Sequence, residues 1–204
     1  ALQRSQACLE MLELDLEQQP EQLVLIHRAK KALQELRRLY DEVREYAAPL
    51  KLERREVLLP VLLEECWQQV RQAAPEIDVE MELRCTGSGL RLQADSHRLQ
   101  QVIRNILENA VAVSPPAGLI EIRCRESLHR GRSAIAIEIL DQGTGLSDEQ
   151  QRRIFDPFFT TKSRGAGLGM AISQRIVEAH GGVIQAENAP QGGARVTVVL
   201  PETS

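Results

Sequence analysis

The sequence predicts an α+β protein built from two parts, a two-helix hairpin and a mixed β-sheet that helices cover on one face. Residues 1–47 contain one proline and no glycine, and their apolar residues recur at helical spacing. From about residue 53, short alternating segments and longer amphipathic segments interleave without the strict strand–helix–strand rhythm of a parallel sheet. We therefore expect one domain at residues 1–52 and a second at residues 53–204.

Pro20 divides the first part, because proline has no amide hydrogen and clashes inside a helix, so it marks a turn between two helices. A hairpin of two helices cannot bury two apolar stripes by itself. We expect a homodimer in which two copies of the hairpin form a four-helix bundle, the alternative being that the hairpin packs on the following domain. The stripes are Leu9, Leu12 and Leu16 in the first helix, and Leu23, Ile26, Leu33, Leu36, Leu39 and Val43 in the second.

The elements expected in the second part follow from periodicity and from turn residues. Asp95 or Ser96 is expected to cap a long helix, and His180 to complement the C-terminus of another. In chain order the elements are a strand at 56–59, a helix at 60–73, strands at 77–84 and 90–94 joined by a turn at 87–89, a helix at 96–113, strands at 119–125 and 133–140, a helix at 168–180, and a closing hairpin of strands at 183–187 and 194–200.

Composition narrows the classes of function. The net charge of −4, without a face-wide basic excess, gives no reason to expect nucleic acid as a partner. The longest apolar runs are far too short to cross a bilayer, so we expect no membrane contact by this fragment and a cytoplasmic location, any anchor lying in another part of the protein. The cysteines form no Cys-x-x-Cys pair, which indicates free thiols in a reducing compartment; they are Cys8, Cys66, Cys85 and Cys124.

Two asparagines lie four residues apart in the helix expected at 96–113. Its apolar stripe faces the core, whereas Asn105 and Asn109 are neighbours on another face. Asparagine is unfavourable inside a helix because its side chain competes for backbone hydrogen bonds. An amide oxygen suits Mg²⁺, which keeps several waters and takes phosphate oxygens as further ligands. Taken alone, such a pair is more often two solvent-facing residues, so its weight depends on the motifs that follow.

A carboxylate and two glycines follow the strand expected at 133–140. Asp141 can accept a hydrogen bond from an exocyclic amine such as that of adenine, and Gly143 and Gly145 let the backbone approach a flat ligand. By itself this pattern is as typical of a turn as of a site. Ser147 and Gln150 then form a capping box that opens a short helix.

All three phenylalanines of the chain fall within residues 155–159. Because threonines, a lysine and several glycines follow them, we interpret the segment as a lid pinned by aromatic side chains, a small satellite core being the plainer alternative. The glycines open the last helix, whose N-terminal amides favour an anionic triphosphate. The spacing matches neither a Walker loop nor the dinucleotide-binding fingerprint.

Taken in order, four segments resemble the N, G1, F and G2 boxes of sensor histidine kinases, which belong with the gyrase, heat-shock chaperone and mismatch-repair ATPases. The resemblance covers about residues 54–202 and implies a Bergerat-type α/β sandwich that holds ATP and Mg²⁺ beneath a flexible lid. The four segments are Asn105-x-x-x-Asn109-Ala110, Asp141-x-Gly143-x-Gly145, Phe155-Asp156-Pro157-Phe158-Phe159 and Gly165-x-Gly167-x-Gly169.

The resemblance also implies roles for individual residues. Asn109 is the expected Mg²⁺ ligand with Asn105 assisting, and Asp141 is the expected adenine contact. The predicted catalytic residues are Asn105, Glu108, Asn109 and Lys162. The predicted nucleotide-binding residues are Asn105, Asn109, Ala112, Asp141, Gly143, Gly145, Phe158, Thr160, Thr161, Lys162, Gly165, Gly167, Leu168, Gly169 and Thr197.

Position 105 separates the branches of this superfamily. The ATP-hydrolysing relatives carry a glutamate there as the general base for water, and the amide of Asn105 cannot take a proton. Efficient hydrolysis is therefore not expected, which suits a kinase that keeps the γ-phosphate for a histidine. Glu108 is the candidate for polarising the attacking group. Ala112 stands where many members carry a basic residue, which bears on phosphate affinity rather than on membership.

The N-terminal hairpin resembles the dimerisation and phosphoacceptor domain of the same family. In that domain the acceptor histidine lies in the first helix, shortly before an Asn-Pro-Leu-like segment. Ala1-Leu2-Gln3 fits the tail of such a segment, so we expect the acceptor a few residues before Ala1. His27 is the rival acceptor, although it lies in the second helix and is followed by Arg28 rather than an acid.

The resemblance thus implies phosphorylation of a histidine by ATP, followed by relay to an aspartate on the receiver domain of a response regulator. Two other classes stay open on the sequence alone. One is a nucleotide-gated pseudokinase, in which ATP only changes the packing of the hairpin. The other is an ATPase clamp of the gyrase and chaperone kind, against which Asn105 argues.

Overall fold

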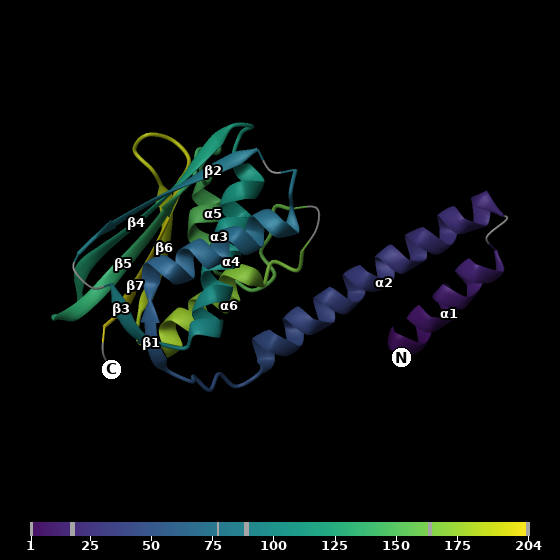
Figure 1. Ribbon diagram of the computed structural model, residues 1–204, viewed down its shortest axis with the longest axis horizontal. Helices are drawn as coiled ribbons and strands as arrows, with labels where there is room; N and C mark the ends of the chain where they lie inside the picture. The colour runs from purple at the N-terminus through teal and green to yellow at the C-terminus, as the bar shows by residue number, and fades with distance from the viewer. Residues whose placement is uncertain (1, 17–18, 77, 88–89, 163–164, 203–204) are drawn as a thin grey trace. The chain divides into compact units, whose positions relative to one another are not determined.

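The computed structural model describes residues 2–16, 19–76, 78–87, 90–162 and 165–202. Its backbone divides into two compact units, one of Ala1–Ala48 with Arg164–Ala166 and one of Pro49–Ser163 with Gly167–Ser204. The first unit is a helical hairpin and the second is a sheet with its helices (Figure 1). The predicted α+β class is confirmed.

The hairpin unit consists of α1 (Leu2–Asp15) and α2 (Pro20–Ala47). Pro20 is the first residue of α2, where its missing amide hydrogen removes no helical bond, so the predicted turn is confirmed. Glu13 of α1 ties the two helices together, because it accepts from His27 Nε2 at 2.8 Å and from Lys30 Nζ at 2.6 Å. The bond from Lys30, followed by that from His27, holds the pKa of the Glu13 carboxyl below its usual value.

The apolar stripe predicted for α2 is only partly buried within one copy of the hairpin. Ile26 is 6% exposed, whereas Leu36, Leu39 and Val43 are 51%, 42% and 40% exposed. Apolar side chains at helical spacing gain little while they face water, so this stripe is a surface that favours burial against another element.

The second unit is built on a five-stranded mixed sheet in the order β2-β4-β5-β7-β6. β2 runs parallel to β4, and the other neighbouring strands are antiparallel. The predicted closing hairpin is the antiparallel pair β6–β7. The strand bounds are β2 (Val79–Thr86), β4 (Gly118–His129), β5 (Arg132–Leu140), β6 (Val183–Asn188) and β7 (Ala194–Pro201).

Helices lie over one face of this sheet, as predicted (Figure 1). The side chains of Ile135, Ile137 and Ile139 in β5 are almost fully buried and form the centre of the core with the apolar stripes of the helices. The helices are α3 (Leu59–Ala73), α4 (Ser96–Val113), α5 (Asp148–Arg153) and α6 (Gly169–Ala179).

Two short strands form a separate antiparallel ribbon, β1 (Arg55–Leu58) with β3 (Arg91–Ala94). The strand expected at 90–94 therefore pairs with the first strand of the unit and not with the strand directly before it. Ser88 and Gly89 of the predicted connecting turn lie outside the described residues. The pairing of β1 with β3 joins the start of the second unit to the residues that lead into α4.

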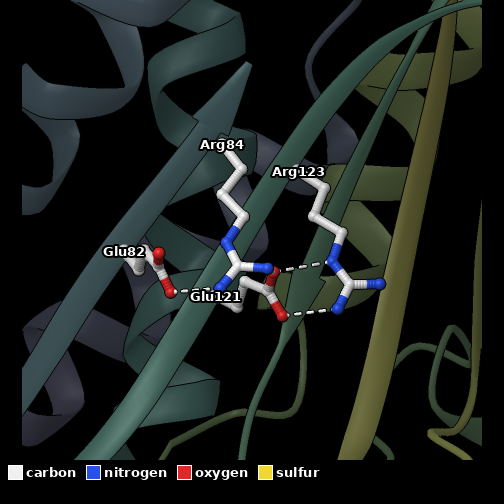
Figure 2. Close-up of polar contacts among 4 residues, drawn as sticks. All are labelled: Glu82, Arg84, Glu121 and Arg123. Carbon is white, nitrogen blue, oxygen red and sulfur yellow. Dashed lines mark hydrogen bonds and ion pairs between the residues drawn. The ribbon is translucent and has the colours of Figure 1, made fainter. Parts of the chain in front are cut away.

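The other face of the sheet carries ion pairs along neighbouring strands. Figure 2 shows Glu121 of β4 accepting from Arg123 at 2.6 and 2.8 Å, beside Arg84 of β2, which lies 2.9 Å from Glu82. The bond from Arg123 is the main cause that holds the pKa of the Glu121 carboxyl below its usual value. Ion pairs on a solvent-facing surface contribute about 0–1 kcal/mol each, so the main effect of this partly buried cluster is to keep the face polar.

His180 complements the C-terminus of α6, as the sequence predicts. It is buried at the end of α6, where its Nε2 accepts from the backbone N–H of Asp95 at 3.0 Å. Its Nδ1 therefore carries the proton and donates to the carbonyl of Ile176 at 2.8 Å. Burial lowers the pKa of His180, so it satisfies the helix end as a neutral imidazole and joins α6 to the start of α4.

All four cysteines have free thiols, as predicted, with Cys8 and Cys85 exposed and Cys66 and Cys124 buried. Burial raises the pKa of the Cys66 thiol to about 12. In the described part of the chain, no helix combines the length and the apolar character that crossing a bilayer requires.

Candidate functional site

Helix α4 supplies the first residues of the candidate site. Its N-terminus is capped by Asp95, whose Oδ1 accepts from Arg98 N at 3.1 Å, as the sequence predicts. The apolar stripe of α4 is buried, and Asn105 and Asn109 lie half-buried on the neighbouring face. The helix is therefore fixed by its core side and its cap, and it presents both amides in a defined orientation.

Asn105 holds α4 against the start of α6. Its Nδ2 donates to the carbonyl of Gly169 at 3.1 Å and lies 3.4 Å from Ser173 Oγ. The structure thus brings the N-box and G2-box segments together through this side chain. Because the amide nitrogen is engaged with α6, Asn105 acts here as a tie between helices.

Asn109 faces a positive charge. Its Oδ1 accepts a hydrogen bond from Lys162 Nζ at 2.6 Å, although the two residues are 53 positions apart in the chain. The carbonyl oxygen predicted to bind Mg²⁺ is therefore oriented toward a position where the structure holds a cation, the ammonium of Lys162. Hard cations and ammonium groups both favour such an oxygen.

Asp141 is 8% exposed and has one carboxylate oxygen fixed by the backbone. Oδ1 accepts from the amides of Gly143 at 2.8 Å and Ala194 at 3.1 Å. In the part of the chain that the structure describes, no hydrogen bond engages Oδ2. A buried carboxylate with one oxygen engaged and one left over can accept a hydrogen bond from a ligand.

The glycines after Asp141 bring the loop close to α4 and to β6. A Cβ on Gly143 would lie 2.7 Å from Val113 Cγ2, at the end of α4, so only glycine allows this approach. Gly145 has φ +77°, and a Cβ there would lie 2.8 Å from Asn188 Oδ1. The loop therefore packs against the end of the same helix that carries Asn109.

The segment after this loop begins with α5. Ser147 and Gln150 form the predicted capping box, with Gln150 N donating to Ser147 Oγ at 3.2 Å and Ser147 N donating to Gln150 Oε1 at 2.7 Å. Arg153 of α5 lies over the ring of Phe159 at 4.6 Å from its centroid. Phe158 is 61% exposed and has φ +66°, an unfavourable conformation for a bulky residue.

Thr160, Thr161 and Lys162 are exposed and lie beside one another. Thr160 Oγ1 accepts from Lys162 N at 3.1 Å, and Gln150 Nε2 lies 3.4 Å from Thr161 Oγ1. Lys162 reaches Asn109 as described above, so this segment meets α4 at the predicted magnesium ligand. Ser163 and Arg164, which follow, lie outside the described residues.

The last predicted glycine segment leads into α6, which begins at Gly169. Gly167 has φ +68°, and a Cβ there would lie 2.5 Å from the carbonyl oxygen of Phe159, which ties the segment to the phenylalanines. Leu168 is fully buried and precedes the helix, so it anchors the N-terminus of α6 in the core. Gly165, with φ +115°, belongs to the short segment grouped with the hairpin unit, so its role in nucleotide binding stays a prediction.

Thr197 requires a correction. It alternates along β7 with the buried residues Val196 and Val198, and it pairs with Glu138 of β5. Thr197 therefore lies on the face of the sheet that carries the ion pairs, opposite the helices. The predicted site residues on α4 and α6 lie on the helix side, so Thr197 is not part of this site.

Two further predicted residues lie on exposed parts of α4. Ala112 lies about one turn after Asn109 and is exposed. Its methyl group carries no positive charge that could contact a phosphate. The carboxylate of Glu108 lies 3.6 Å from Arg104 Nε in an i,i+4 pair and is 53% exposed. Glu108 is next to Asn109 in sequence but points along a neighbouring face of the helix.

Several residues that hold the site lie in the β6–β7 hairpin and in α6 and were not predicted from the sequence. Asn188 and Ala194 contact the glycine loop, and Ser173 contacts Asn105. Gly193 has φ +76°, and a Cβ there would overlap the carbonyl oxygen of Asp141. The adjacent Gly192-Gly193 pair was the available signal, but nothing in the sequence says which loop a hairpin end will contact.

Across residues 2–16, 19–76, 78–87, 90–162 and 165–202, no group of three or more His, Cys, Asp or Glu side chains is placed to hold a metal ion. The amide oxygen of Asn109 fits Mg²⁺, which commonly takes one or two protein ligands and completes its shell with water and phosphate oxygens.

Comparison with known proteins gives one matching family model, described as histidine kinase-, DNA gyrase B-, and HSP90-like ATPase, over residues 94–204. That range contains the residues brought together above. The sensor histidine kinase ZraS of Klebsiella oxytoca is 37% identical over 166 residues, which covers 81% of this chain and 35% of that protein. The chain therefore spans about a third of the length of this relative.

Two solved structures resemble the chain over most of its length. The match to full-length ShkA in complex with AMPPNP covers 89% of this chain and 39% of the ShkA chain, with 26% sequence identity and a TM-score of 0.75. The match to histidine kinase ThkA in complex with the response regulator protein TrrA covers 90% of this chain and 51% of the ThkA chain, with 26% sequence identity and a TM-score of 0.71.

Proposed function

The chain belongs to the histidine kinase-, DNA gyrase B- and HSP90-like ATPase family, and we propose that it is the catalytic part of a sensor histidine kinase, which binds Mg-ATP and transfers the γ-phosphate to a histidine. The observation that carries this proposal is the arrangement of Asp141. One of its oxygens is fixed by two backbone amides, and the other is left to accept from an adenine amine, beside the helix that carries Asn109.

The residues present fit the two bound groups that the family implies. Asp141 and the glycine loop would hold the base, and Asn109 would supply a ligand to Mg²⁺, which when bound neutralises charge on the phosphates. Lys162, with Thr160 and Thr161 beside it, offers a positive charge and hydroxyls to phosphate oxygens. The N-terminus of α6 adds amides and a favourable dipole on the same side.

The chemistry at position 105 favours transfer over hydrolysis. A hydrolase of this superfamily needs a carboxylate base for water, and Asn105 offers an amide whose nitrogen is bonded to Gly169 O. Asn105 therefore orders the two helices that hold the nucleotide without activating water. Glu108 is the nearest carboxylate to Asn109 along the chain, and we propose it as the group that polarises the attacking histidine.

We further propose that two copies pair through the hairpin and that the acceptor histidine lies upstream of Ala1. The half-exposed stripe of Leu36, Leu39 and Val43 supports pairing, because a second copy would bury it. The complex of ThkA with TrrA supports a response-regulator receiver domain as the partner that accepts the phosphate.

The test is labelling with Mg-ATP that carries a tagged γ-phosphate, comparing this chain with one extended upstream by a few helical turns. Acid-labile phosphate on the extended chain alone is the expected result. Labelling of the present chain that disappears in His27→Gln would instead identify His27 as the acceptor. Binding of ATP without labelling of either chain would favour the pseudokinase, and fast steady-state release of phosphate would favour an ATPase.

A further inference from the structure

The glycine loop that follows Asp141 is held at both ends by one cross-strand pair. At its first end, Asp141 N donates to Ala194 O at 3.0 Å and Ala194 N donates to Asp141 Oδ1 at 3.1 Å. At its other end, Leu146 N donates to Asn188 Oδ1 at 2.6 Å and Asn188 Nδ2 donates to Leu146 O at 3.0 Å. Asn188 and Ala194 are register partners in β6 and β7, so the end of this hairpin closes the loop 141–146.

The side chain of Asn188 binds both the N–H and the C=O of Leu146, as the backbone of a paired strand would. It can do so because a neutral primary amide offers one acceptor and one donor in the same plane. The contact is also close in space, since a Cβ on Gly145 would lie 2.8 Å from Asn188 Oδ1. Both the conformation of Gly145 and the end of the loop therefore depend on this amide, although Asn188 itself is exposed.

We propose that Asn188 is a positioning residue for recognition of the nucleobase. The inference rests on the proposed function, in which Asp141 and the glycine loop hold adenine. Asp141 Oδ1 accepts one of its two bonds from Gly143 N, inside the loop, so the orientation of Oδ2 toward the base depends on the loop as well as on Ala194. Loss of the Asn188 amide lets the loop populate other conformations, and the apparent affinity falls in proportion to the fraction that remains competent.

This role differs from a contribution to folding in what it changes. The groups proposed for the phosphates and the magnesium ion lie on α4, on α6 and at Lys162, and the Asn188–Leu146 bonds do not involve them. Loosening the loop should therefore reduce discrimination between bases. A structural defect alone would lower the amount of folded protein equally for every nucleotide.

The experiment measures the affinities of Mg-ATP and Mg-ITP by calorimetry for the wild-type chain and for Asn188→Ala, with amide hydrogen exchange of Leu146 in the absence of nucleotide. Inosine carries an oxygen where adenine carries the amine, so the ratio of the two affinities reports base reading. Two lost hydrogen bonds should weaken Mg-ATP binding about tenfold, shrink the preference for ATP, and speed exchange at Leu146.

Two variants sharpen the result. Gln185→Ala removes an exposed side chain from the same strand and should leave both affinities and the exchange unchanged. Asn188→Asp keeps the acceptor for Leu146 N and loses the donor to Leu146 O, so its ratio should lie between those of the wild type and Asn188→Ala. If Asn188→Ala keeps the wild-type ratio of Mg-ATP to Mg-ITP affinity and the wild-type exchange rate at Leu146, the role of Asn188 is overturned while the proposed function stands. A wild-type chain that binds no Mg-ATP overturns the proposed function and the inference with it.

Discussion

Replacing Asp141 by Asn is the sharpest substitution that the structure offers, because the surroundings dictate how the new amide must orient. The amides of Gly143 and Ala194 both donate to Oδ1. In Asp141→Asn the carbonyl oxygen has to stay on that side, since an NH₂ group there would face two donors. The NH₂ group therefore takes the place of Oδ2 and points a donor at the amine that the carboxylate would bind.

The expected cost follows from the bonds involved. A hydrogen bond to a charged group contributes about 1.5–3 kcal/mol, and facing two donors adds a further penalty, so about 2–4 kcal/mol of binding free energy is lost. This corresponds to a loss of Mg-ATP affinity of roughly 30- to 1,000-fold. The two backbone bonds survive, so the midpoint of thermal unfolding should change little.

Calorimetric titration with Mg-ATP and with Mg-ITP measures this effect. The oxygen of hypoxanthine accepts where the amine of adenine donates, so Asp141→Asn should lose affinity for ATP and gain relative preference for ITP. The matched control is Glu138→Gln, which changes a carboxylate of β5, the strand that leads into Asp141, on the opposite face of the sheet. Unchanged ATP affinity in a folded Asp141→Asn chain would refute the assignment of Asp141 to the base.

Three other outcomes are expected. Asn109→Ala should reduce the affinity for Mg-ATP to the level measured with ATP and a chelator, a loss of tenfold or more if the amide oxygen is a Mg²⁺ ligand. Gly193→Ala should lower the free energy of unfolding in urea by about 2 kcal/mol or more, because the new Cβ overlaps the carbonyl oxygen of Asp141. Since the pKa of His180 is lowered on folding, the unfolded chain binds the extra proton, so stability should fall as the pH drops below the ordinary histidine value, by up to about 1.4 kcal/mol per pH unit. Urea midpoints between pH 7.5 and 5.5 measure this, and His180→Gln should flatten the slope.

Elements governed by local rules could be predicted from the sequence. The N-cap of α4 at Asp95 and the capping box of Ser147 and Gln150 depend on residues within one turn, and both are present as predicted. The pairing of β3 depends on a contact with β1, more than thirty residues earlier, and no local pattern specifies that choice. The strand itself could therefore be predicted from its residues, whereas its partner could not.

The candidate site shows the same division between local and distant information. Asn105, Asn109 and Asp141 were singled out because four segments in order resemble the motifs of one family, whereas each segment taken alone was ambiguous. Asn188 was missed because its role depends on a loop 42 positions away in the chain. Thr197 was misplaced although a signal was present: Val196, Val198 and Leu200 alternate with it, so the strand pattern already puts Thr197 on the other face.

The measurement that most directly tests the central claim is a calorimetric titration of the chain with ATP, once with Mg²⁺ and once with a chelator. If Asp141, Asn109 and Lys162 form a Mg-ATP site, the titration should show saturable binding at one site per chain and clearly weaker binding without Mg²⁺. A folded chain that gives no saturable heat with Mg-ATP, or binds ATP equally well with the chelator, would contradict the account.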